Sequence, residues 1–530
     1  MNKEIYLNEY PKHKDMRENV KRDPNRLHFH MMPPTGWMND PNGLCQFRGI
    51  NHIYFQYTPF LAGWGTKLWG HYTTKDWVHY AEEEPFLFPD TKWDRDGVYS
   101  GSALVKEDGI HFFYTGNVKL TDKEYDYIMN GREQNTMHLF SPDGKTITCK
   151  EMVMTNDDYP SNMSKHVRDP KVYEKDGVYY MIQGGRDEND KGCALLFQST
   201  DLKNWKWYDT IYPERTFGYM WECPDLFEIE GQQIMTCCPQ GVEQNGYDYQ
   251  NVYQCGYFPV NFDLKNRKYQ LGKFVEFDKG FDIYATQTFL DEQGRRILIG
   301  WMGIPDADYD NDATVSYDWI HALTMPRELI LKEGKIFQKP LKEMQQLRKN
   351  EFHCALSEFT QWKPQDSCFE LHIDFEERTV KVEATAEKEE QKKKEIVGEV
   401  EEQKVENKEI TKKKEVKNTE IEDKQEKSSI KIQLREDVFL SWGKGVFRLN
   451  MGKSGRGRKE RVAKVEQLRN LTIFSDTSAI EVFINDGETV MTTRVYNETL
   501  EQTVTFLSKG NDGNVGNVTG YELGSFVIEK

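Results

Sequence analysis

The sequence predicts an all-β protein in which a five-bladed β-propeller is followed by a C-terminal β-sandwich. Three observations support this fold class. A strand–turn–strand unit recurs five times between residues 40 and 299, apolar and polar residues alternate within its copies, and no amphipathic helix separates the strand pairs. A hairpin unit that is repeated in this way is typical of propeller blades.

Residues 1–30 are polar and show little periodicity, so we expect a lead-in segment that wraps the first domain. The propeller is expected over residues 31–335. Each repeat begins with a strand and a turn and continues into a second strand, often rich in aromatic residues. Successive copies start roughly 55–70 residues apart, which leaves room for further strands in each blade. The copies begin at Asp40, Ser100, Asp169, Cys223 and Ala285.

Residues 345–530 are expected to form the β-sandwich. Residues 369–375 and 479–485 alternate between apolar and polar side chains, and Asn485-Asp486-Gly487 is a hairpin signal. From about 387 to 427 the chain consists almost entirely of Glu, Lys, Gln and Asn. Because this composition cannot bury a core, we expect a solvated insertion there, with a partner-docking element as the alternative.

Composition and charge exclude several classes of function. A net charge of −17 argues against nucleic-acid partners and anionic membrane surfaces. The chain has no apolar run long enough to span a bilayer, and its N-terminus lacks the apolar region of a secretory signal. Nine scattered cysteines form no zinc-ligand pairs, so we expect reduced thiols in a cytoplasmic protein. No metal or cofactor is expected, and the oligomeric state is left open.

Three acidic residues occupy corresponding places in the repeats. Asp40 opens the first copy, and Pro41 favours an extended backbone conformation at Asp40, the residue before it. Asp169 opens the third copy, and Glu222 directly precedes the fourth. Since the first strands of propeller blades line one central channel, we expect the three carboxylates to converge at one mouth of it. Metal binding by the same trio is the competing interpretation, but no His lies beside them at ligand spacing.

Converging carboxylates fit the cleavage of a glycosidic bond, which needs one carboxylate as nucleophile or base and a protonated one as acid. Glu222 lies between Trp221 and Cys223, an apolar setting that we expect to favour its protonated form. Arg168 precedes Asp169, and its charge is expected to favour an ionised carboxylate. The residues therefore suggest Glu222 as the acid and the two aspartates as the ionised pair.

Together these stretches resemble the signature motifs of the invertase and β-fructofuranosidase family, glycoside hydrolase family 32. The motifs are Trp37-Met38-Asn39-Asp40-Pro41-Asn42-Gly43, Arg168-Asp169-Pro170 and Trp221-Glu222-Cys223-Pro224-Asp225. The resemblance implies a propeller with a sandwich and a retaining double displacement on a terminal β-fructosyl unit. It implies Asp40 as nucleophile, Glu222 as general acid/base and Asp169 as transition-state stabiliser.

The resemblance also implies a fructose subsite, lined by Asn39, Gln56, Trp64, Ser100 and Arg168 and walled by Tyr284 and Trp301. Tyr99 stands at the rim, where the family commonly has Phe or Trp. Within the family the chain is most similar to bacterial sucrose-6-phosphate hydrolases and intracellular sucrases. A small sugar, sucrose or its 6-phosphate, is therefore the expected substrate. An exo-acting fructan hydrolase, a fructosyltransferase and a carbohydrate-binding propeller without turnover are the alternatives.

Overall fold

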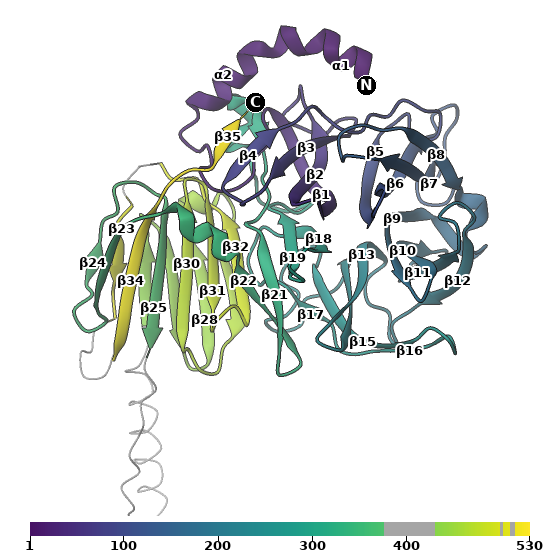
Figure 1. The fold of residues 1–530 in the computed structure, drawn as a ribbon. Coiled ribbons are helices and arrows are strands. Elements are labelled where there is room, and N and C mark those ends of the chain that lie inside the picture. Colours follow the sequence, from purple (N-terminus) through teal and green to yellow (C-terminus); the bar gives the residue numbers. More distant parts are fainter. Residues whose placement is uncertain (376–429, 499–501, 509–514, 530) are drawn as a thin grey trace, which may run out of the picture.

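Five antiparallel sheets follow one another between residues 36 and 340 and form an N-terminal propeller (Figure 1). The computed structural model describes residues 1–375, 430–498, 502–508 and 515–529, so the predicted insertion at about 387–427 lies outside the described residues. The strands of the first two sheets are β1 (Gly36–Phe47), β2 (Ile50–Thr58), β3 (Leu68–Thr74) and β4 (His79–Glu82), then β5 (Val98–Lys106), β6 (Gly109–Lys119), β7 (Arg132–Ser141) and β8 (Cys149–Met154).

The remaining three sheets of the propeller have the same antiparallel order. They contain β9 (Met163–Lys175), β10 (Val178–Asp187), β11 (Gly192–Ser199) and β12 (Lys206–Ile211); β13 (Met220–Ile229), β14 (Gln232–Gln240), β15 (Gly256–Asp263), β16 (Lys268–Leu271) and β17 (Val275–Glu276); and β18 (Tyr284–Leu290), β19 (Arg296–Trp301), β21 (Arg327–Lys332) and β22 (Lys335–Pro340). All five predicted repeat starts fall on the first strand of a sheet.

The first strands of the five sheets close a ring. β1 contacts β5, β5 contacts β9, β9 contacts β13, β13 contacts β18, and β18 returns to β1. Apolar side chains fill the wedge between neighbouring sheets, as where Trp69 meets Phe112 and where Phe113 meets Trp205. Each sheet thus needs its neighbours to bury its faces, which explains why the same strand pattern recurs along the sequence.

Two short strands tie distant parts of the chain to the first blade. β20 (Trp319–Ile320) pairs in parallel with the start of β1, and the C-terminal β35 (Val527–Glu529) pairs in parallel with β4. Figure 1 shows β35 in yellow beside β4, close to the helices at the N-terminus. The C-terminus of the sandwich domain is therefore part of a propeller sheet.

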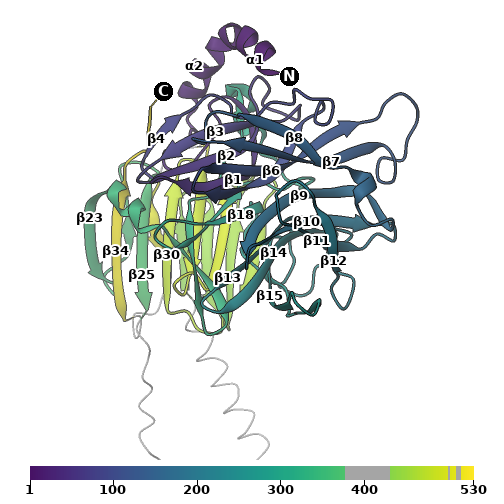
Figure 2. The same ribbon diagram turned by 45° about the vertical axis from the view of Figure 1, so that its right-hand side comes forward.

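Two six-stranded sheets stack into the predicted β-sandwich beside the propeller (Figure 2). Apolar side chains from both sheets, such as Leu371 and Leu440, fill the space between them. The predicted strand at 369–375 is β25, and the turn at Asn485 follows β31. The strands are β23 (Arg348–Ala355), β34 (Gly516–Leu523), β25 (Phe369–Phe375), β30 (Asn470–Asp476), β31 (Ala479–Ile484) and β32 (Thr489–Arg494), then β24 (Gln361–Trp362), β33 (Val504–Phe506), β26 (Ile430–Leu434), β27 (Val438–Gly443), β28 (Val446–Met451) and β29 (Glu460–Lys464).

The N-terminal segment contains two helices that the sequence did not predict, α1 (Lys3–Glu9) and α2 (Lys14–Arg22). The Asn2 side chain caps α1 by accepting a hydrogen bond of 2.9 Å from the amide of Ile5. Each helix buries a single residue, Tyr6 in α1 and Val20 in α2, so neither has an apolar stripe that periodicity could detect. Short 3-10 turns complete the described structure: η1 (Tyr10–His13), η2 (Asn156–Asp158), η3 (Asp312–Tyr317), η4 (Lys342–Leu347) and η5 (Lys453–Gly455).

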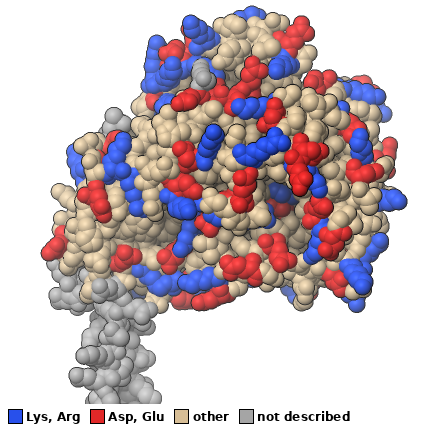
Figure 3. All heavy atoms as spheres, viewed as in Figure 1, with Lys and Arg blue, Asp and Glu red and all other residues tan. Residues whose placement is uncertain are grey.

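None of the helices in the described ranges is both long and apolar enough to cross a membrane. On the face drawn in Figure 3, acidic and basic side chains are interspersed. The net charge of −17 is therefore not gathered into one acidic patch on this face.

Candidate active site

A β-bulge interrupts the first strand of every blade near the same end. In each case two residues of the first strand lie opposite one residue of the second strand. Bulges turn side chains out of the regular alternation, and they are frequent beside active sites. The bulged pairs are Asn39-Asp40, Tyr99-Ser100, Asp169-Pro170, Cys223-Pro224 and Ala285-Thr286.

The three carboxylates converge on this ring of bulges. Asp40 is the second residue of its bulge, Asp169 is the first of its bulge, and Glu222 directly precedes the bulge of β13. The expected equivalence of repeat positions therefore holds only to within two residues. All three side chains line a single pocket of about 760 Å³ at the channel mouth.

Asp40 is held by donors from the first two blades. Asn39 donates to its Oδ1 at 2.8 Å, and the Ser100 hydroxyl donates to its Oδ2. Gln56 lies opposite the bulge, accepts a hydrogen bond from Asn39 at 3.2 Å and donates to Ser100 at 2.7 Å. Burial raises the pKa of Asp40, while the hydrogen bonds from Ser100 and Asn39 oppose this rise. This network fixes the orientation of the carboxylate.

Glu222 lies among polar groups, so the apolar setting expected from its sequence neighbours is wrong. The Tyr284 hydroxyl and the Gln240 amide donate to its Oε2 at 2.5 and 2.7 Å. Arg168 donates twice to its Oε1, at 2.6 and 2.9 Å. Successive side chains of a strand point to opposite faces, and Trp221 accordingly packs into the cluster between blades. The neighbours of Glu222 in space come from three other strands.

Asp169 is the most deeply buried of the three, with 4% of its surface exposed and a φ of +64°. Its amide donates to the Thr115 hydroxyl at 2.8 Å, and its Oδ2 accepts from the amide of Cys223 at 2.9 Å. Burial raises the pKa of Asp169 to about 7, and Arg168 opposes the rise. Arg168 thus holds the pKa of Asp169 down less than the sequence neighbours suggested, since it lies closer to Glu222, at 2.6 Å, than to Asp169, whose Oδ2 is 4.0 Å away.

Every residue predicted for the sugar subsite lines the same pocket. Trp64 is 61% exposed and stands at the rim, with its ring edge-on to Trp37 at 5.8 Å. Trp301 is buried and contacts Tyr284 edge-on, so it supports the wall from behind. The predicted lining residues are Asn39, Gln56, Trp64, Tyr99, Ser100, Arg168, Tyr284 and Trp301.

Most of the pocket residues that were missed come from second or third strands and from loops that carry no repeat signal. Gln240 ends β14, Arg132 begins β7, and His321 follows β20. Of the missed residues, Trp37 belongs to the first signature motif, and His166 lies three residues before Asp169. The additional lining residues include Trp37, Tyr127, Arg132, His166, Gln240, Tyr253, Asp306, Asp312 and His321.

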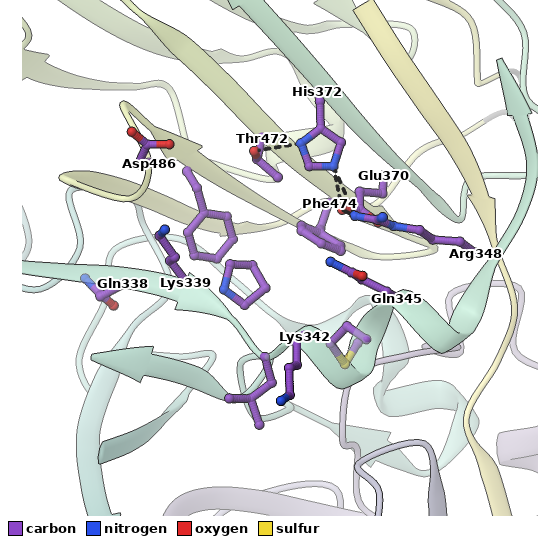
Figure 4. Close-up of a pocket in the computed structure, with 14 residues that line it drawn as sticks. Gln338, Lys339, Lys342, Gln345, Arg348, Glu370, His372, Thr472, Phe474 and Asp486 are labelled. Carbon is purple, nitrogen blue, oxygen red and sulfur yellow. Dashed lines mark hydrogen bonds and ion pairs between the residues drawn. The ribbon is translucent and has the colours of Figure 1, made fainter. Parts of the chain in front are cut away.

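A second, smaller cavity of about 260 Å³ lies where η4 meets the sandwich (Figure 4). On its wall His372 lies between Thr472 and Glu370, with ring nitrogens 3.1 and 2.6 Å from these partners. Arg348 donates to both oxygens of Glu370 at 2.7 Å. These charges are paired with one another and lie in the other domain, so this cavity is not part of the carboxylate site.

Comparison with known proteins agrees with this architecture. Residues 30–340 match the model of the glycosyl hydrolases family 32 N-terminal domain, and residues 369–522 match that of the family 32 C terminal. The chain is 37% identical to sucrose-6-phosphate hydrolase of Bacillus subtilis over 89% of each chain, and 36% identical to that of Staphylococcus xylosus over 91% of this chain and 90% of the relative.

Solved structures are similar along the whole chain. Sucrose-6-phosphate hydrolase from Lactobacillus gasseri superposes with a TM-score of 0.78 at 25% identity, covering 97% of this chain and 96% of that one. A Bombyx mori β-fructofuranosidase shares the fold with a TM-score of 0.75 at 24% identity, covering 99% and 100% of the two chains. With two family models that together span most of its length, this chain belongs to glycosyl hydrolases family 32.

Proposed function

We propose that this glycosidase releases the terminal β-fructosyl unit of sucrose or sucrose 6-phosphate by a retaining double displacement. The observation that carries the proposal is the convergence of Asp40, Asp169 and Glu222 from three blades in one pocket. A retaining glycosidase needs a carboxylate nucleophile and a second carboxyl group that acts first as acid and then as base. The relatives that cover about nine tenths of the chain are named sucrose-6-phosphate hydrolases.

In the proposed first step, Asp40 attacks the anomeric carbon of the fructosyl unit while Glu222 protonates the glycosidic oxygen. The bond to the glucosyl group breaks, and a covalent fructosyl–Asp40 ester forms. In the second step Glu222 takes a proton from water, the water attacks the ester, and fructose is released. Asp169 would accept hydrogen bonds from fructose hydroxyls and stabilise the positive charge that develops at the sugar ring.

The surroundings of Glu222 stabilise its carboxylate, which is the product of the first step and the base of the second. Arg168 and the Tyr284 hydroxyl donate to its carboxylate, so they stabilise the charge that remains after the proton has been transferred to the leaving group. The same carboxylate is then the base for water. Asp40, in contrast, receives neutral donors from Asn39 and Ser100, which orient it while leaving its charge available for attack.

The cysteines support a proposal for the compartment. All nine cysteines are unpaired, including Cys238 and Cys255, whose sulfur atoms are 3.6 Å apart. Buried cysteines without a disulfide framework fit a reducing compartment, where thiols are kept reduced. We therefore propose that the enzyme acts in the cytoplasm, on sugar that has already entered the cell.

Two substitutions test the assigned roles. Asp40→Asn removes the nucleophile and should reduce kcat/KM for sucrose by more than about a thousandfold, equivalent to ~4 kcal/mol of barrier. Glu222→Gln removes the proton donor and should reduce it by about 10²–10⁴-fold. A nitrophenyl β-fructofuranoside separates the roles, because its leaving group needs little protonation. It should rescue Glu222→Gln in the first step but not Asp40→Asn.

Glu228→Gln is the matched control, since Glu228 lies on the same strand as Glu222 and is exposed outside the pocket. Its kcat/KM should equal that of the wild type. If Asp40→Asn or Glu222→Gln kept sucrose turnover within tenfold of the wild type, the assigned roles would be wrong.

A further inference from the structure

The wall of the pocket on the Glu222 side contains a buried cation without a balancing charge. Arg132, at the start of β7, is 3% exposed and donates to the neutral hydroxyl of Tyr99. Within the described ranges no carboxylate lies at ion-pair distance from it, and its Nε has no hydrogen-bond partner. Arg168, in contrast, is neutralised by Glu222 at 2.6 Å. A buried guanidinium is normally paired, so Arg132 requires an explanation.

His166 adds a second unused donor on this wall. Its Nδ1 lies 3.0 Å from Nη1 of Arg168, and because a guanidinium only donates, Nδ1 must be the unprotonated acceptor. Burial, together with the charges of Arg168 and Arg132, lowers the pKa of His166 to about 2, so the ring is neutral. The neutral ring then carries its hydrogen on Nε2, which is buried and has no partner.

Tyr127 holds these two donors in place. The guanidinium of Arg132 stacks on the Tyr127 ring at 3.8 Å, and the same ring meets His166 edge-on at 5.6 Å. Such stacking restricts the guanidinium to one plane and leaves its edge free for a bidentate acceptor. Burial and the like charge of Arg168 lower the pKa of Arg132 to about 10. The charged guanidinium is therefore destabilised by these surroundings, and a bound anion would stabilise it.

The charges at the pocket rim are distributed unequally. Asp306 and Asp312, the two lining carboxylates outside the catalytic trio, both lie on the segment that leads into η3 or begins it. Arg132 and His166 lie on β7 and β9, next to the Arg168 that contacts Glu222. An anionic group on the substrate is therefore attracted to the wall beside Glu222 and repelled by the segment around Asp306.

We propose that Arg132 and the Nε2–H of His166, with Tyr99 and Tyr127 as supports, form a subsite for a phosphate monoester on the leaving group of the substrate. This inference rests on the proposed function, because Glu222 as proton donor defines the leaving-group side. A phosphate oxygen pair matches the planar fork of Arg132, and a third oxygen accepts from His166. An unphosphorylated glucosyl group would leave Arg132 without a counter-charge.

The experiment compares kcat/KM for sucrose 6-phosphate and sucrose in the wild type and in variants. In the wild type, kcat/KM for sucrose 6-phosphate should be at least ten times kcat/KM for sucrose. Arg132→Gln should reduce this ratio at least tenfold, and His166→Leu should reduce it at least threefold. Arg132→Lys keeps the positive charge, so it should retain part of the preference for the phosphate. Arg295→Gln is the control, because Arg295 is paired with Asp291 outside the pocket, and its ratio should be that of the wild type.

A second measurement needs no variant and therefore does not depend on Arg132 variants folding. Glucose 6-phosphate should inhibit wild-type sucrose hydrolysis at a concentration at least tenfold lower than glucose, and added KCl should narrow this difference. Equal inhibition by the two sugars would overturn the phosphate subsite, and so would an unchanged ratio of kcat/KM values in a folded Arg132→Gln protein. In either case, continued turnover of sucrose would leave the proposed function standing. Failure of the wild type to cleave either sugar would instead refute the proposed function itself.

Discussion

At the scale of single residues, Lys67 is an unusual neighbour for Asp40, the proposed nucleophile. Its side chain is 1% exposed, its Nζ donates to the Thr58 hydroxyl at 3.2 Å, and it lies 4.6 Å from the ring centre of Trp37. A second indole, that of Trp64, lies 4.7 Å from the same ammonium group. Burial lowers the pKa of Lys67 to about 7, and the charge of Asp40 opposes this shift.

Lys67→Met tests whether this cation keeps Asp40 ionised. The pKa of Lys67 is about 7, so its ammonium group is charged at lower pH. An ammonium ion favours the ionised form of a nearby carboxylate. Without it the pKa of Asp40, already raised by burial, should rise further. Because Asp40 must be ionised to attack, the acidic limb of the kcat/KM–pH profile should move to higher pH by about 0.5–1 unit.

The exposed Lys119 at the end of β6 provides the control for this charge removal. Lys119→Met should leave the acidic limb in place. An acidic limb that is identical in the wild type and in Lys67→Met would show that Lys67 has no influence on the ionisation of Asp40.

At the scale of elements, the start of β1 determines where the first bulge lies. Gly36 has a φ of +73°, donates to the carbonyl of Asp318 at 2.6 Å, and would place an added Cβ 2.0 Å from the carbonyl oxygen of Thr58. That oxygen belongs to the backbone of β2 and cannot rotate away. Since Asn39-Asp40 follows three residues later, displacement of this strand end would also displace the proposed nucleophile.

Gly36→Ala and Gly49→Ala form a matched pair. Both glycines have nearly the same φ, +73° and +75°, but a Cβ at Gly49 would meet nothing within 4 Å. Gly49→Ala should therefore cost only the backbone strain of about 1 kcal/mol, while Gly36→Ala adds a backbone clash and should cost about 3 kcal/mol or more. Urea-unfolding midpoints measure the difference, and equal losses would contradict it. Only Gly36→Ala should also lower kcat/KM.

At the scale of the whole molecule, buried ion pairs join the propeller to the sandwich. His30, just before the propeller, lies between Asp476 at 2.8 Å and Glu481 at 3.1 Å in the sandwich. Glu481 also pairs with Arg327 of β21 at 2.7 Å. Burial by itself lowers the pKa of His30, but the two carboxylates outweigh it, so the pKa is raised. The charged imidazole therefore contributes to holding the two domains together.

The contribution of His30 should depend on pH. Its folded pKa is raised above the unfolded value of about 6.5, so its stabilisation is complete below that pH and is lost as the pH rises through the folded pKa. His30→Gln should lower the free energy of unfolding by about 3 kcal/mol at pH 6 and by less at pH 9. Thermal midpoints at the two pH values measure this difference.

His79→Gln is the control, because His79 is 59% exposed and pairs with Asp76 only three residues away. Its effect should be below about 1 kcal/mol at both pH values. A loss in His30→Gln that did not change between pH 6 and pH 9 would mean that the imidazole acts through packing and not through its charge.

The sequence alone determined those features that depend on local patterns. Alternation of apolar and polar residues identifies strands, and their recurrence identifies blades, because each blade must bury the same two faces. The motifs around Asp40, Asp169 and Glu222 are short, so they too could be read from the chain. The helices α1 and α2 escaped detection because each buries only one side chain.

The tertiary structure decided which groups surround each carboxylate. Arg168 is adjacent to Asp169 in sequence but pairs with Glu222, 54 positions along the chain, since bulges and strand pleating direct neighbouring side chains to different places. The wall of Arg132 and His166 likewise joins strands from two blades. Sequence neighbours along a strand thus say little about the environment of a site that is assembled from five different first strands and from the residues that lie beside them.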